Sequence, residues 1–285
     1  MKLNSNLMSM GIYRNYSKSL KLQSIALNRI STGEKITSSK DNPNGIGKSE
    51  LLRLQIRGID MAQRNLQDSA SMLQNVDSGL DSIGNALNRM KELTIQAGSA
   101  NTIEDKEAIQ GEIEQLKAHI DSTAKNTEFN GKKLLHNNEV SDNNIPNYIV
   151  NASGANKGDN IYIPTYNLSL DNMRTDEGDT LKDIDIRKED GVDKALEVID
   201  EISKDVISIR SKYGALQNRI ESSKEALGNT YIALTNSDSS LRDADLAEEM
   251  VNFAKEGILI DSSRALMAQS NKFPQDILRV LERVK

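Results

Sequence analysis

Neither cysteine nor tryptophan occurs in this chain of 285 residues, and aromatic residues make up only 4% of it. Without cysteine the chain can form no disulfide framework and no thiolate zinc site. Because ligand pockets are usually lined by aromatic side chains, this composition argues against a small-molecule or cofactor site. No apolar run approaches the length of a transmembrane helix, so no membrane partner is predicted.

Acidic residues are absent from the first 33 residues, which contain five basic ones: Lys2, Arg14, Lys18, Lys21 and Arg29. The same stretch lacks the central apolar run of a cleavable secretory signal, so we expect no such signal. A basic, serine-rich and acid-free start is also typical of mitochondrial transit peptides, and this alternative stays open at this point. Over the whole chain the formal net charge is −6, which argues against nucleic acid as the main partner.

Catalytic and metal-binding motifs are missing as well. The sequence has no HExxH pair, no glycine-rich phosphate loop, no G-x-S-x-G element and no EF-hand loop. His119 and His136 are the only histidines, and His119 stands among charged residues that are typical of a solvated helix face. We therefore predict that the protein is not an enzyme and uses no metal or cofactor.

Apolar residues in heptad spacing dominate two long stretches, residues 59–94 and 199–234. In the first, every seventh residue from Leu66 to Leu87 is leucine; in the second, every seventh residue from Ile199 to Ile220 is isoleucine, valine or tyrosine. A narrow apolar stripe on a long helix is buried best against another helix that carries the same stripe. The spacing predicts two long helices that pack antiparallel as a coiled coil.

Shorter patterned segments surround these two stretches. Residues 13–30 and 104–125 predict helices, and the Asn-Pro-Asn-Gly run at residues 42–45 predicts a turn between helices. Two patches with a period of two, residues 148–150 and 161–163, predict a β-hairpin.

One more helix is predicted in the last part of the chain. Residues 236–240 are polar and predict a break, after which residues 241–284 are amphipathic. Pro274 lies inside this segment and must end or kink the helix, because proline supplies no backbone N–H.

The fold class that these patterns predict is mainly α, a long antiparallel coiled-coil or bundle rod of helices with a small β-hairpin region. We expect three regions along the rod. They are the terminal coiled-coil segments 1–45 with 241–285, a helical rod of residues 46–136 with 191–240, and a short hairpin and loop insert of residues 137–190.

Five short motifs in the two helical halves resemble bacterial flagellin. LNRISTGEKI at residues 27–36 is similar to the family's RLSSGxRI element, and NRMKELTIQ at residues 88–96 is similar to QRVRELxVQ. EFNGKKLL at residues 128–135 resembles QFNGxKLL. LRDADLA at residues 241–247 and MAQSNKFPQ at residues 267–275 resemble RIxDADxA and LAQANQxPQ. The resemblance covers nearly all of the chain except the central insert, so we expect a short flagellin.

This resemblance implies a structural subunit that polymerises with itself into the extracellular bacterial flagellar filament for motility. It also implies passage through the flagellar export apparatus without a cleaved signal, and an export chaperone that binds the C-terminal segment, residues 241–285. The terminal segments are expected to be disordered in the free monomer and to pair in the filament core. The predicted polymerisation seam consists of seven side chains of these segments: Tyr16, Leu20, Leu27, Ile30, Leu246, Met250 and Phe253.

The family's innate-immune recognition patch maps onto Arg89, Leu93 and Glu112 of this sequence. Arg89 and Leu93 are four residues apart on a predicted helix and therefore share a face, on which we expect Leu93 to be partly exposed. Packing between neighbouring subunits is the alternative role for the same residues.

Some residues depart from the flagellin pattern. Asn42 and Pro43 stand where flagellins usually have Asp-Ala, and a proline there favours the hook–filament junction protein as an alternative. Charged residues, among them Asp261, Arg264 and Lys272, enter a C-terminal segment that is nearly uncharged in most flagellins. A soluble coiled-coil adaptor is a third alternative, because heptads alone would suit it.

Overall fold

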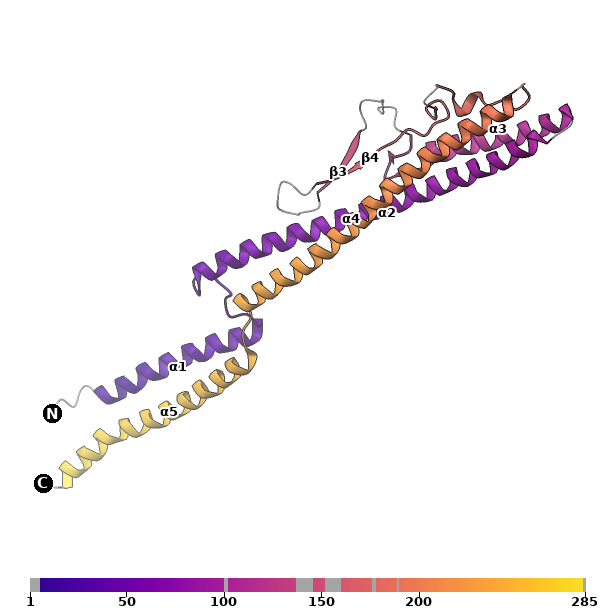
Figure 1. The fold of residues 1–285 in the computed structure, drawn as a ribbon. Coiled ribbons are helices and arrows are strands. Elements are labelled where there is room, and N and C mark those ends of the chain that lie inside the picture. Colours follow the sequence, from indigo (N-terminus) through magenta and orange to yellow (C-terminus); the bar gives the residue numbers. More distant parts are fainter. Residues whose placement is uncertain are drawn as a thin grey trace. The chain divides into compact units, whose positions relative to one another are not determined.

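Five α-helices make up most of the computed structural model, which describes residues 6–99, 102–136, 146–151, 160–175, 178–188 and 190–283 (Figure 1). The elements in chain order are α1 (Leu7–Thr32), α2 (Pro43–Gly98), α3 (Ile103–Asn126), β1 (Glu128–Phe129), β2 (Lys132–Lys133), β3 (Asn147–Asn151), β4 (Asn160–Pro164), η1 (Leu181–Asp183), α4 (Gly191–Arg242) and α5 (Leu246–Arg283). The predicted fold class, mainly α with a small β-hairpin region, is confirmed.

The chain divides into two compact units, Met1–Leu54 with Ala233–Lys285 and Gln55–Ile232. Helices α2 and α4 each contribute residues to both units. The first unit contains the two terminal helices, α1 and α5, and the second contains α3 and both hairpins. The boundaries predicted at residues 45, 136, 190 and 240 stay predictions.

In the second unit α2 and α4 pack antiparallel. Arg210 donates to Asp77 at 2.8 Å, and Nζ of Lys91 lies 2.5 Å from Asp200, so later residues of α2 meet earlier residues of α4. The heptad residues are buried, each no more than 3% exposed: Leu66, Leu73, Leu80, Leu87, Ile199, Val206, Tyr213 and Ile220. Burial of one such side chain contributes about 1.5–3 kcal/mol. The predicted pairing of the two heptad stretches is confirmed.

Two polar side chains of α3 are buried and fix the segment that precedes α4. Nζ of Lys117 donates to the carbonyl oxygens of Lys182 and Ile184 at 3.0 and 2.8 Å. Oε1 of Gln110 accepts from the backbone N–H of Ile186 at 3.1 Å. These contacts satisfy backbone groups that belong to no strand, which allows the segment to lie buried against α3.

Two short hairpins lie between α3 and α4. Strands β3 and β4 pair antiparallel with Ile149 opposite Tyr162, so the hairpin predicted from the period-two patches is confirmed. The β1–β2 hairpin was not predicted. Its turn residues, Asn130 and Gly131, have φ angles of 51° and 74°, and an Asn-Gly pair with positive φ is a strong hairpin signal that the sequence does carry.

A turn at residues 42–45 was predicted, and this prediction is wrong because α2 already begins at Pro43. Proline suits the first position of a helix, where its missing N–H removes no intrahelical hydrogen bond. Oδ1 of Asn42 accepts from the N–H of Gly45 at 2.9 Å, which is the hydrogen bond of a helix N-cap. The Asn-Pro pair therefore starts a helix.

The break predicted at residues 236–240 is also wrong, because α4 continues to Arg242. The hydroxyls of Ser237 and Ser240 donate to carbonyl oxygens four residues earlier, at 2.8 and 2.9 Å, so these polar side chains are satisfied within the helix. The helix break comes at residues 243–245. Asp245 then caps α5, since its Oδ1 accepts from the N–H of Ala247 at 2.9 Å.

Replacing Lys117 by methionine should lower the free energy of unfolding by about 2–4 kcal/mol. The carbonyl oxygen of Lys182 loses the hydrogen bond from Lys117, and that of Ile184 keeps only the longer one, 3.3 Å, from Nε2 of Gln110. Urea denaturation followed by circular dichroism measures this change. The matched control is Lys125→Met on the same helix, where an exposed lysine pairs with Asp121, and its effect should stay below about 0.5 kcal/mol. Equal effects of the two substitutions would contradict the role given to Lys117.

Candidate assembly surface

Helices α1 and α5 of the first unit lie side by side and run antiparallel (Figure 1). Near the start of α1, Oγ of Ser9 donates to Asn271 at 3.2 Å. Near its end, Nη1 of Arg29 lies 2.8 Å from Glu249. The two terminal segments thus form one helix pair with a defined register.

Pro274 was predicted to end or kink the helix; it does not end it, because it lies inside α5, which continues to Arg283. A helical proline leaves the carbonyl four residues earlier without its donor, here that of Ser270. Nδ2 of Asn6 donates to this carbonyl oxygen at 3.0 Å, while its Oδ1 caps α1 by accepting from the N–H of Ser9 at 3.1 Å. One asparagine therefore satisfies backbone groups of both terminal helices.

The contact between α1 and α5 buries mainly small and polar side chains. The side chains buried in this helix pair are Ser19, Ala26, Glu249, Glu256, Ile260, Ser263 and Ser270. Because hydrophobic stabilisation grows with buried apolar area, such a contact stabilises the pair far less than the leucine-rich contact of α2 and α4.

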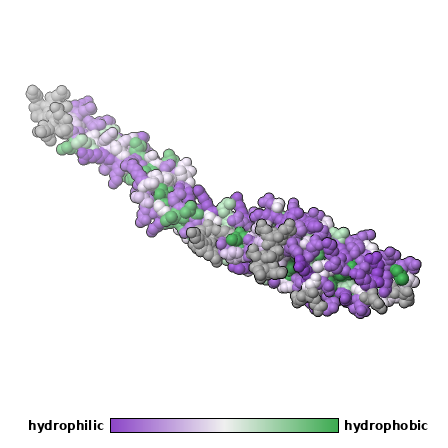
Figure 2. Space-filling model, turned by 90° about the horizontal axis from the view of Figure 1, so that it is seen from above, coloured by the Kyte–Doolittle hydropathy of each residue, from purple (hydrophilic) through white to green (hydrophobic). Residues whose placement is uncertain are grey.

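Large apolar side chains of both helices remain exposed instead. On α1, Tyr13, Leu20 and Leu27 are 59%, 48% and 54% exposed and stand seven residues apart. On α5, Leu266 and Phe273 are 52% and 69% exposed, also seven residues apart. Figure 2 shows hydrophobic residues reaching the surface among hydrophilic ones over these helices. We call Tyr13, Leu20 and Leu27 the α1 stripe, and Leu259, Leu266 and Phe273 the α5 stripe.

The seven predicted seam residues fall into two groups. Tyr16, Ile30 and Phe253 are partly buried. The other four are exposed, by 48% to 57% of their surface: Leu20, Leu27, Leu246 and Met250. Tyr13, Leu259, Leu266 and Phe273 are exposed as well and were not among the predicted seam residues, although their seven-residue spacing is a signal that the sequence contains.

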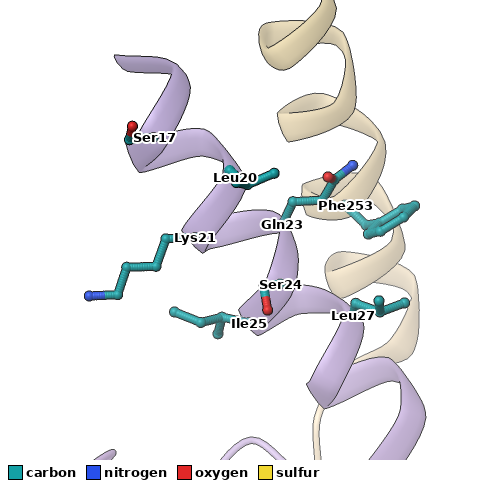
Figure 3. A pocket seen from close by; sticks show the side chains of 8 residues that line it. All are labelled: Ser17, Leu20, Lys21, Gln23, Ser24, Ile25, Leu27 and Phe253. Carbon is teal, nitrogen blue, oxygen red and sulfur yellow. The ribbon is translucent and has the colours of Figure 1, made fainter. Parts of the chain in front are cut away.

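An open groove of about 640 Å³ lies beside the α1 stripe (Figure 3). Leu20 and Leu27 line it from α1 and Phe253 from α5, so its walls come from both helices. Lys21 lines it as well and points away from α5 in Figure 3. The groove therefore combines apolar walls with one basic side chain.

A network of ion pairs and backbone hydrogen bonds joins the α1–α2 connection to the α4–α5 connection. The N–H of Lys35 donates to the carbonyl oxygen of Arg242 at 2.6 Å, and the guanidinium of Arg242 lies 3.3 Å from Glu34. Burial raises the pKa of Asp238, but hydrogen bonds from Ser49 and Arg53 outweigh this and hold the pKa below its usual value. These contacts fix both chain connections of the first unit to each other.

The predicted recognition patch lies in the second unit. Nη2 of Arg89 is 3.0 Å from Glu112 and Nη1 is 3.1 Å from Glu92, so the structure brings Arg89 and Glu112 together on the surface. Leu93 is only 2% exposed and belongs to the core cluster with Met90, so the expectation that it is partly exposed is wrong. The i, i+4 spacing from Arg89 did not reveal this, because Leu93 lies on the edge of the α2 heptad stripe and turns inward.

Within the part of the chain that the structure describes, no group of three or more histidine, cysteine, aspartate or glutamate side chains could hold a metal ion. A helix with the length and apolar character needed to span a membrane is likewise not found among the described residues. His119 lies 3.1 Å from Oγ of Ser82.

Two family models match this chain. The bacterial flagellin N-terminal helical region matches residues 3–139, and the bacterial flagellin C-terminal helical region matches residues 196–281. The chain belongs to the bacterial flagellin family. Its relatives include flagellin of Bacillus subtilis strain 168, which is 33% identical and aligns over 99% of this chain and all of its own length. Flagellin of Halalkalibacterium halodurans is 34% identical over 99% of this chain and all of its own length.

Membership in this family confirms the predicted function of this flagellin as a structural subunit of the extracellular flagellar filament. Flagellins are structural proteins rather than enzymes. A solved structure of a putative flagellar hook-associated protein from Vibrio parahaemolyticus has a TM-score of 0.62 and 18% identity, covering 71% of this chain and all of that one. At this identity the likeness shows a shared fold only.

Replacing Asn6 by alanine should weaken the α1–α5 pair by about 1–2 kcal/mol, because α1 loses its N-cap and the Ser270 carbonyl loses its donor. Hydrogen exchange of α1 and α5 amides in the assembled filament measures the effect. Asn15→Ala on the exposed surface of α1 is the matched control and should change exchange little. Unchanged protection in Asn6→Ala would contradict the bridging role.

Proposed function

We propose that this flagellin polymerises through the α1 and α5 stripes and that its terminal helices pair stably only in the filament. The proposal rests on which side chains this helix pair buries and which it exposes, a distribution opposite to that of the α2–α4 contact. Apart from Ile260, the buried side chains of the pair are small or polar, while the five large side chains Tyr13, Leu20, Leu27, Leu266 and Phe273 are 48% to 69% exposed. Outward apolar side chains of this number are covered by a protein partner in stable assemblies.

The two stripes are different surfaces of the same chain. Tyr13, Leu20 and Leu27 belong to α1, whereas Leu266 and Phe273 belong to α5. Contacts between two unlike patches repeat from copy to copy, and they generate an open helical polymer when the rotation between copies does not close a ring. The α1 stripe of one copy against the α5 stripe of the next therefore supports a filament better than a closed dimer.

The same exposed apolar surfaces support a proposal about how the subunit is exported. A free subunit with both stripes exposed would aggregate before assembly, so a chaperone that covers the C-terminal segment, residues 241–285, would protect it. We include passage through the flagellar export apparatus without a cleaved signal in this proposal. An innate-immune receptor would contact Arg89 and Glu112, both about half exposed, rather than the buried Leu93.

The junction-protein alternative loses its main support. Asn42 and Pro43 provide the N-cap and the first residue of α2, which is ordinary chemistry for a helix start. Alignment over the full length of two flagellins supports the filament subunit.

Polymerisation of the purified subunit from short seeds tests this function. Leu266→Ser and Phe273→Ser should each raise the critical concentration for elongation at least tenfold, because each removes about 2 kcal/mol of apolar burial at the contact. Sedimentation and electron microscopy measure the polymer. Deletion of residues 1–33 or 241–285 should abolish it.

Ile207→Ser is the matched control, an apolar side chain of α4 that is 66% exposed in the second unit. Its critical concentration should stay within about threefold of the unsubstituted chain. If the stripe variants polymerise as readily as this control, the stripes are not the assembly surface.

A further inference from the structure

Methionine is the only sulfur-containing residue of this chain, because cysteine is absent. A two-electron oxidant such as hydrogen peroxide converts an accessible methionine to methionine sulfoxide, and an apolar side chain thereby becomes polar. What such an oxidant does to this protein therefore depends on which methionines are accessible and on what their side chains contact.

Burial separates the methionines that the structure describes. Met72, Met90 and Met173, all in the second unit, are 6%, 0% and 4% exposed. Met267 is partly buried. Four others are at least half exposed: Met8, Met10, Met61 and Met250. Three of these four lie in the first unit, so the exposed sulfur is concentrated in the terminal helix pair.

Met10 continues the apolar stripe of α1. Four residues that line the groove from α1 are separated alternately by three and four positions: Ser17, Leu20, Ser24 and Leu27 (Figure 3). Tyr13 and Met10 continue this spacing toward the start of the helix, four and seven residues before Ser17. Residues at this spacing share one face of a helix. Met10 therefore lies on the face of the α1 stripe, about two turns before the groove.

Met250 lies toward the opposite end of the groove. Its neighbour on α5, Glu249, pairs with Arg29 at 2.8 Å, so Met250 is level with the end of α1. Phe253, which lines the groove from α5, follows Met250 by three residues, so the two are neighbours on the helix surface. Two exposed thioethers, one on each terminal helix, thus flank the groove at its two ends.

We propose that Met10 and Met250 are oxidation sites of the free subunit and that their oxidation blocks its assembly. This inference rests on the proposed polymerisation and names a modification that controls it. In the reaction with hydrogen peroxide, the thioether sulfur attacks one peroxide oxygen, so that an S–O bond forms and the O–O bond breaks. The proton on the transferred oxygen passes to the departing hydroxide, which leaves as water. Sulfur loses two electrons and the peroxide gains them.

A sulfoxide at either position opposes the contact between copies. Its oxygen accepts hydrogen bonds from water, and it loses them when a neighbouring copy covers the side chain. The large side chains beside it in the groove are apolar and donate no replacement: Leu20, Leu27 and Phe253. The same contact covers both thioethers once the filament has formed. The filament should therefore resist an oxidant that inactivates the free subunit.

Seeded elongation of the full chain after peroxide treatment tests this inference. Treatment of the free subunit should raise the critical concentration about tenfold, and mass spectrometry of its peptides locates the sulfoxides. Met10→Leu combined with Met250→Leu keeps both side chains apolar and removes both sulfurs. The critical concentration of this variant should stay within about twofold after the same treatment.

Met8→Leu combined with Met61→Leu is the matched control. It also removes two exposed sulfurs, one of them in the second unit and the other five residues before Tyr13, off the α1 stripe. This variant should stay as sensitive to peroxide as the unsubstituted chain.

Three further measurements separate oxidation at these two sites from general damage. Met10→Gln combined with Met250→Gln introduces polar groups without an oxidant and should raise the critical concentration about tenfold. Methionine sulfoxide reductases for both sulfoxide epimers should restore elongation of the oxidised subunit. In the assembled filament, Met10 and Met250 should oxidise about tenfold more slowly than in the free subunit.

Three results would overturn the inference. They are normal elongation of a subunit shown to carry both sulfoxides, full peroxide sensitivity of the Met10→Leu and Met250→Leu variant, and equal oxidation rates of these residues in subunit and filament. Each leaves the proposed polymerisation intact. If the untreated chain itself does not elongate on seeds, the proposed polymerisation fails, and this inference fails with it.

Discussion

Small and polar side chains fill the contact between α1 and α5, and the behaviour expected of the terminal segments depends on this contact. Ser19, Ala26 and Ser263 bury little apolar surface, and Oε2 of the buried Glu256 accepts no hydrogen bond from any residue that the structure describes. Fixing the backbone of two long helices costs about 1–2 kcal/mol per residue in conformational entropy. A contact of this composition offsets little of that cost, which is why we propose that the exposed apolar side chains of both helices stabilise the pair in the filament.

The second unit shows the opposite arrangement. There the large heptad residues of α2 and α4 face each other and are buried. Polar groups that enter this core are satisfied, as in Lys117 with two carbonyl oxygens and Tyr213 with the carbonyl of Pro164. A helix pair that buries its own apolar stripe folds without a second copy, whereas one that exposes it depends on assembly.

Much of this architecture could be predicted from the sequence, since leucine at every seventh residue of α2 indicates a buried stripe directly. The start of a helix was harder to recognise where it depends on one residue. Asn42 caps α2, although the residues around it resemble a turn. Burial that depends on register could not be predicted. The buried position of Glu256 follows only from which residues of α1 and α5 meet, and those residues are more than 200 positions apart.

Hydrogen exchange of the free subunit and of the assembled filament, compared helix by helix, tests this account most directly. Amides of α1 and α5 should exchange rapidly in the free subunit and become protected in the filament, while the core residues of α2 and α4 in the second unit are protected in both. Equal and strong protection of α1 and α5 in the free subunit would contradict the account, because the terminal pair would then be stable without a neighbour.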